Sequence, residues 1–153
     1  MPIQRIQAEV KTTITIKNLQ KKLYPNAKRI KQAVLKALSQ LDFKKSIELS
    51  ICFVTDAKIR RLNLRYRGSD EPTDVLTFDN SIDRGRLLAD IVVSTDTAIR
   101  NSKIFKTSSH YEIYLYVVHG LLHLAGYQDK NLRQAGIMDK LAGKICQYTK
   151  PKP

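Results

Sequence analysis

Apolar and polar residues alternate along two stretches of the chain, at 13–16 and 47–53, and this period of two predicts half-buried strands. Two more strands are expected from the extended segment at 73–78 and the apolar run at 87–93. Elsewhere apolar residues recur every three or four positions, which predicts helices. Helices are expected to begin at Pro25, at Thr55 or Asp56, at Ser94, at Ser109 and after Asp129, the last running to about Tyr148.

Several of these helices carry signals for their ends. Gly68 and Gly126 can adopt the left-handed backbone that terminates a helix. Ser109 and Glu112 have the spacing of a capping box, which would start the helix that follows. In the last helix, the residues expected to face the core are Ile137, Leu141 and Ile145.

The order of the elements predicts the fold class. Helices and strands alternate only loosely, which favours an α+β fold with a mixed β-sheet of about four strands covered by about five helices. No repeat or low-complexity segment divides the 153 residues, so residues 1–153 are expected to form a single domain.

Basic residues outnumber acidic residues by a wide margin. The chain has 27 Lys and Arg against 14 Asp and Glu, a formal net charge of +13. This excess favours an anionic partner, and nucleic acid is the leading candidate because Lys and Arg neutralise its phosphates. The alternative is a soluble protein that is merely basic.

Neither export nor insertion into a membrane is predicted. The N-terminus lacks the layout of a signal peptide, and the apolar run at 113–124 is too short to span a bilayer. Cys52 and Cys146 form no CxxC motif and lie in apolar patterns, so buried thiols are expected. These features favour a cytoplasmic location with no membrane partner.

The motif with the clearest chemistry is HGLLHLAGYQD, from His119 to Asp129. Helical residues four apart lie roughly 40° apart on one face, one turn up, so His119 and His123 can share a metal ion. Gly126 then lets the chain turn, and the carboxylate of Asp129 can return as a third ligand. Three protein ligands with one open position are typical of a catalytic site with one zinc ion, and they favour hydrolysis.

Other interpretations of these residues were weighed against the metal site. Two histidines on an apolar helix can simply be structural core residues. His110 would lie about 180° round the helix from His119 and is a poor third ligand, while the neutral amide of Gln128 suits zinc less well than a carboxylate. Metalloproteases of the HExxH type need a glutamate general base where this chain has Gly120.

A second segment, LNLRYRGSDEPTDVLTF, has two arginines at a predicted helix end. Arg65 and Arg67 carry the guanidinium that suits bidentate contact with phosphate. They can equally be solvated, or paired with the acidic residues that follow, which are Asp70, Glu71 and Asp74. Asp74 also fits a turn before a strand.

Together these segments resemble the YbeY family of metal-dependent endoribonucleases. The histidine motif is similar to the family's HGxLHLxGYDH, and the second segment to LNxxYRxxDxPTDVLSF. A third segment, LADIVVS at 88–94, is similar to LGDIxIS. The three segments occur in the family's order, and the resemblance covers nearly the whole chain.

The resemblance implies a mixed α/β fold and a zinc-dependent hydrolase that cuts phosphodiester bonds in single-stranded RNA. It further implies a role in ribosomal RNA maturation, including processing of the 16S rRNA 3′ end, and in ribosome quality control, with the ribosome or ribosomal proteins as candidate partners. The family's catalytic arginine falls on Arg67. Its third metal ligand is usually a histidine, and this chain has Asp129 at that position.

A second hypothesis belongs to another class of protein. It is an RNA- or ribosome-binding assembly factor whose metal is mainly structural. The net charge and the lack of an obvious general base support it. The two hypotheses differ in whether the metal-loaded protein cleaves unstructured RNA and loses that activity with a chelator.

Overall fold

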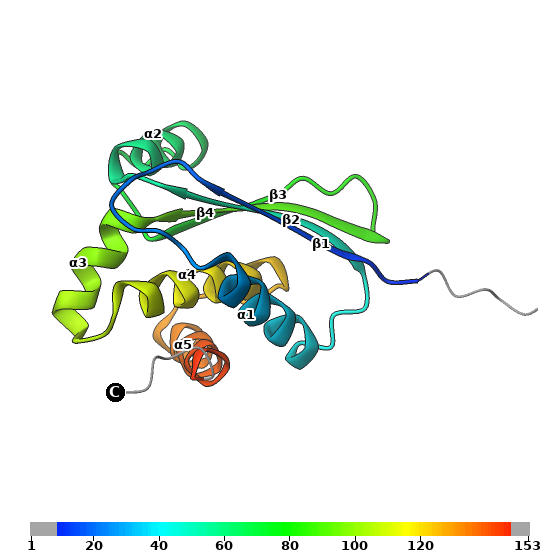
Figure 1. The fold of residues 1–153 in the computed structure, drawn as a ribbon. Coiled ribbons are helices and arrows are strands. Elements are labelled where there is room, and N and C mark those ends of the chain that lie inside the picture. Colours follow the sequence, from blue (N-terminus) through cyan, green and yellow to red (C-terminus); the bar gives the residue numbers. More distant parts are fainter. Residues whose placement is uncertain (1–8, 148–153) are drawn as a thin grey trace, which may run out of the picture.

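In the computed structural model, which describes residues 9–147, four strands form one mixed sheet (Figure 1). In spatial order they are β1 (Thr12–Asn18), β2 (Ser46–Val54), β4 (Arg86–Ser94) and β3 (Val75–Asp79). The first three run parallel, and β3 pairs antiparallel with β4 at one edge. This arrangement confirms the predicted mixed sheet.

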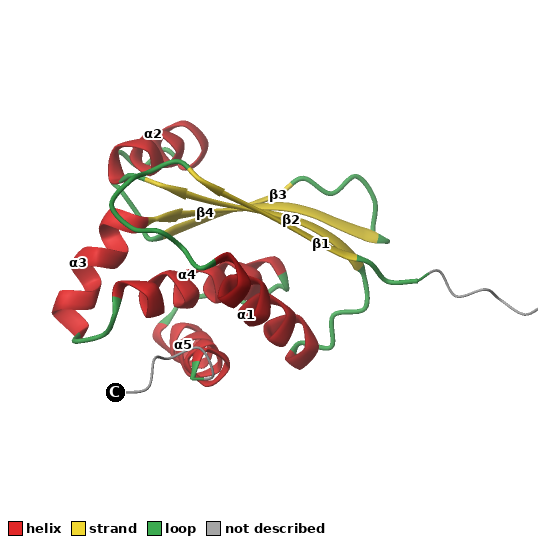
Figure 2. Ribbon diagram, viewed as in Figure 1, coloured by secondary structure: helices red, strands yellow, loops and turns green. Residues whose placement is uncertain are grey.

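The helices form layers on both faces of the sheet (Figures 1 and 2). α1 (Ala27–Gln40) and α4 (Ser109–Leu124) cover one face, and α5 (Leu132–Cys146) packs on these two helices from outside. α2 (Asp56–Arg67) lies on the opposite face, and α3 (Thr95–Phe105) leads from β4 to α4. Five helices around four strands in residues 9–147 confirm the predicted fold class. None of these helices is both long and apolar enough to cross a membrane.

Two apolar clusters hold the layers together. The larger lies between the sheet and helices α1, α4 and α5. β2 contributes every second residue to this cluster: Ile47, Leu49, Ile51 and Phe53. The smaller cluster lies under α2 and comprises Val54, Ile59, Leu76 and Val92. Burying one such side chain contributes about 1.5–3 kcal/mol, so the larger cluster is the main stabilising element.

α4 is the central helix of the packing on this face of the sheet. It lies between the sheet and α5, which explains why the helix is apolar nearly all round. Gly120 faces the sheet so closely that an added methyl group would lie 3.0 Å from Ile91 Cγ2 and 3.1 Å from Thr77 Cγ2. Between Tyr111 and His123, only one strip of the helix stays partly open, and it is defined here as the half-exposed strip. Its residues lie four apart and are Tyr111, Leu115, His119 and His123.

α1 begins two residues later than expected, and α4 begins at Ser109 as expected but with a different capping residue. α4 is capped by the side chain of Ser108, so the capping box expected to start at Ser109 does not form. The Ser109 hydroxyl instead lies 3.2 Å from the Ser102 hydroxyl on α3, a contact that local sequence does not reveal. α1 is capped by Asn26, so Pro25 lies just before the helix rather than in its first turn.

The buried face of α5 is shifted by about one residue from the expected one. Ile137, predicted to face the core, is 50% exposed. The buried residues are Met138, Ala142, Ile145 and Cys146. Spacing alone fits either face, and packing against α4 selects the face that carries Met138. The expected helix end near Tyr148 lies outside the described residues.

Replacing Gly120 with alanine is expected to lower the free energy of unfolding by about 1–3 kcal/mol, because the new methyl group would press on packed side chains of two strands. Urea unfolding measures this change. The matched control is Gly136→Ala on α5, where an added methyl group meets no atom within 4 Å. That variant is expected to be more stable by about 0.5–1 kcal/mol, because alanine favours a helix interior. Equal effects at both sites would contradict the close approach of α4 to the sheet.

Candidate metal centre on helix α4

His119 and His123 lie one turn apart on the half-exposed strip of α4. Their side chains are 19% and 31% exposed. α4 ends at Ala125, and the chain turns at Gly126, whose φ of +102° suits glycine. The turn brings the Asp129 Oδ2 atom to 3.7 Å from His123 Nε2. The structure therefore places all three residues of the expected ligand set in one region.

His119 faces a different carboxylate. Its Nε2 atom lies 3.3 Å from Oδ1 of Asp139, which α5 carries. This nitrogen is buried, yet it has no hydrogen-bond partner. Burial lowers the pKa of His119, and the negative charges of Asp139 and Asp74 only partly oppose that effect. His119 is therefore a neutral imidazole at neutral pH, the form that binds metal ions.

The residues of this region fit a divalent metal ion. Imidazole nitrogen and carboxylate oxygen are its common protein ligands, and a buried imidazole nitrogen without a partner is costly unless something binds it. As the side chains stand, no three potential ligands within residues 9–147 converge on one point. They instead form two histidine–carboxylate pairs, His119 with Asp139 and His123 with Asp129.

The other candidate residues lie in distinct places. His110 contacts a different part of the chain from His119 and His123, because its Nε2 lies 3.0 Å from the carbonyl oxygen of Tyr24. Arg67, the last residue of α2, is exposed, and its Nη2 donates to the carbonyl of Thr77 on β3 at 3.1 Å. The side chain of that same threonine packs against Gly120, next to His119. Edge strand β3 thus connects Arg67 to the histidine helix.

Two acidic residues near His119 have roles that the sequence did not reveal. Asp74 lies at a bend just before β3 and accepts a hydrogen bond from the Val75 N–H at 2.8 Å, and its charge also acts on His119. Asp139 lies on a different helix from the histidines and belongs to no local motif, so the sequence alone does not indicate it. The PTDVL segment, which belongs to the second motif, draws attention to Asp74, whereas only the packing of α5 on α4 reveals Asp139.

A cavity of about 470 Å³ opens beside the histidines. α3, α4 and α5 form its walls, and both His119 and Asp139 line it. Three aromatic residues also line it: Phe105, Tyr111 and Tyr116. The Tyr116 hydroxyl accepts a 2.9 Å hydrogen bond from the Asn101 amide, which fixes the ring. A planar, partly polar group that entered this cavity would therefore lie next to His119, while His123 lies outside its lining.

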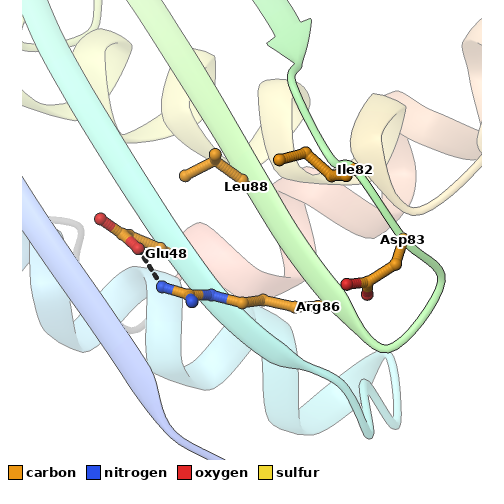
Figure 3. Close-up of a pocket in the computed structure, with 5 residues that line it drawn as sticks. All are labelled: Glu48, Ile82, Asp83, Arg86 and Leu88. Carbon is orange, nitrogen blue, oxygen red and sulfur yellow. Dashed lines mark hydrogen bonds and ion pairs between the residues drawn. The ribbon is translucent and has the colours of Figure 1, made fainter.

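A second, smaller cavity of about 220 Å³ is shown in Figure 3. Leu88 and Ile82 lie on one side of it, and an ion pair between Arg86 and Glu48 lies on the other. Glu48 and Leu88 alternate with the strand residues buried against α1 and α4, so they face the opposite side of the sheet. This cavity has no part in the histidine site.

Comparison with known proteins decides the family. The family model of endoribonuclease YbeY matches residues 13–150. The chain belongs to this family. A relative from Syntrophus aciditrophicus, named endoribonuclease YbeY, is 34% identical over 136 residues, which cover 84% of this chain and 83% of the relative. Another of that name, from Chelativorans sp., is 36% identical over 123 residues, which cover 77% and 76%.

A solved structure has a similar fold. The solution structure of a Thermotoga maritima protein matches with a TM-score of 0.58 and 25% sequence identity, covering 90% of this chain and 91% of that one. These findings confirm the family resemblance drawn from the three sequence motifs. They leave the roles of His119, His123, Asp129 and Arg67 as predictions.

In the chelator-treated protein, His119 is expected to titrate below its ordinary pKa of 6.5, because burial disfavours the imidazolium. Between the ordinary pKa of 6.5 and the lower pKa of the folded state, the unfolded chain binds more protons than the folded one, so stability is lost as pH falls from 6.5 through the folded-state pKa. NMR titration of the histidine resonances measures the midpoint, and His119→Gln assigns the signal. A midpoint at or above the value measured in urea would contradict the burial of this ring.

Proposed function

We propose that this chain is a metal-dependent endoribonuclease that cleaves single-stranded RNA. One arrangement carries the proposal: the histidine pair of α4 with its facing carboxylates, beside an aromatic cavity, in a chain of the YbeY family. By the resemblance to that family, its cellular role is maturation of ribosomal RNA, including the 16S rRNA 3′ end, and ribosome quality control.

His119, His123 and Asp129 hold one divalent ion in this proposal, and zinc is the expected metal. An ion bound there supplies Lewis-acid polarisation of a phosphate oxygen or of water. The protein's own contribution is to hold the ligands ready. Burial keeps His119 neutral, and the short turn after α4 returns Asp129 to His123.

Arg67 stabilises the negative charge that builds up on the phosphate during cleavage. A guanidinium has five N–H donors in a fixed plane, and the bond to Thr77 occupies one of them. The remaining donors can reach a phosphate oxygen while that bond holds the side chain at the sheet edge. Preorganised donors of this kind are among the largest contributions to catalysis.

The surface chemistry supports single-stranded RNA as substrate. A net charge of +13 attracts the phosphate backbone irrespective of sequence. Phe105, at the mouth of the cavity, is 63% exposed and can stack on an unpaired base. A base that is paired within a duplex is not available for such stacking, which favours an unpaired strand.

Replacing His123 with alanine is expected to abolish stoichiometric metal binding and RNA cleavage together, because the ion loses a central ligand. Metal analysis and cleavage of an unstructured RNA measure the two effects. His110→Ala is the matched control, since that histidine contacts Tyr24 and not the site. The assembly-factor hypothesis would be supported instead if the wild type never cleaved RNA and loss of the metal lowered the melting temperature.

Arg67→Ala is expected to reduce cleavage about 10²-fold or more, the typical loss for one electrostatic stabiliser. The melting temperature should barely change, because the side chain is exposed and forms one described hydrogen bond. Arg61→Ala removes the same charge from another face of α2 and serves as the control. Equal activity losses in the two variants would reject a specific role for Arg67 and leave only a general charge effect.

A further inference from the structure

The contact between His119 and Asp139 has the dimensions of a shared metal ligand pair. Two ligand atoms bound about 2.1 Å from one ion at angles of 90–109° lie roughly 3.0–3.4 Å apart. His119 Nε2 and Asp139 Oδ1 are 3.3 Å apart. The expected pair, His123 Nε2 and Asp129 Oδ2, is wider at 3.7 Å. Asp139 therefore matches the ligand spacing at least as well as Asp129 does.

The nitrogen that Asp139 faces distinguishes a ligand from an outer-shell partner. A carboxylate that only orients a metal-bound histidine bonds to the ring nitrogen that does not hold the metal. Asp139 and Asp129 both face Nε2 of their histidines. Each carboxylate therefore faces the ring nitrogen of its own histidine that would bind an ion, rather than the opposite nitrogen.

A hydrogen bond does not account for the contact between His119 and Asp139. His119 Nε2 is buried and has no hydrogen-bond partner, although a carboxylate oxygen lies 3.3 Å away. A cation between the two atoms would satisfy both.

The surroundings of Asp139 leave room for such an ion. Gly136 and Gly143 lie three residues before and four residues after it, on the same face of α5. An added methyl group at either glycine would meet no atom within 4 Å. The Asp139 side chain is 72% exposed and can rotate toward the histidines. The face of α5 around Asp139 is thus open rather than filled by packed side chains.

We infer that Asp139 is a fourth protein ligand, so that this chain holds its metal with two histidines and two aspartates. The inference rests on the proposed metal site and adds to it. Four protein ligands fill a tetrahedral coordination shell. Binding of water or phosphate to the same ion therefore requires a coordination number of five or six. A site with two carboxylates and five or six ligands suits Mn²⁺ better than a site with three protein ligands, which is typical of zinc.

Metal binding tests this inference without reference to activity. The full chain is stripped with chelator, and calorimetry with Mn²⁺ and with Zn²⁺ gives the two affinities for wild type and Asp139→Asn. Loss of the carboxylate should weaken Mn²⁺ binding about tenfold or more, and Zn²⁺ binding by a smaller factor. Asp83→Asn removes an equal charge from the β3–β4 loop and should leave both affinities unchanged.

Cobalt spectra separate a direct ligand from a distant charge. Co²⁺ absorbs visible light weakly when it has five or six ligands and strongly when it has four. Wild type should give the weak spectrum, and Asp139→Asn a stronger one. Unchanged affinities, or lower affinities with an unchanged spectrum, would overturn the role of Asp139 while leaving the proposed function intact. A wild type that binds neither metal would overturn both proposals.

Discussion

The close contact of α4 with the sheet is the constraint on which the rest of the structure depends. Gly120 permits it, because its missing side chain lets Ile91 and Thr77 fill the space beside the helix backbone. With that face fixed against the strands, α5 covers a second face, and only the half-exposed strip remains open. The histidines lie on this strip, so the same packing that stabilises the core also orients the site.

The elements and the histidine pair could be predicted because both depend on local spacing. Alternation and short apolar runs predicted the strands, and the four-residue interval placed His119 and His123 on one face. The features that could not be predicted depend on contacts between segments that are distant in the sequence. Which face of α5 is buried was misjudged at Ile137, because two faces were nearly equally apolar and α4 selects between them. Asp139 and the bond from Arg67 to β3 arise from the same kind of long-range packing.

The charge distribution around the site is opposite to that of the whole chain. Asp74, Asp129 and Asp139 place three carboxylates near the histidines, in a protein with a net charge of +13. Alone, this group repels a phosphate at short range, where the surrounding dielectric is lower than that of water. A divalent cation would be the largest local charge and would reverse the effect. Long-range attraction of RNA and short-range acceptance of the scissile phosphate are therefore separate properties, and only the second requires the metal.

The position of β3 at the edge of the sheet gives its bond with Arg67 a further consequence. An edge strand presents unpaired backbone groups on which a strand of another molecule can form, and charged side chains at the edge oppose such pairing. The guanidinium of Arg67 occupies the Thr77 carbonyl and places a positive charge beside it. Two copies of the chain that approached through this edge would each bring that charge. The residue proposed to act on RNA thus also protects the folded protein from edge-to-edge aggregation.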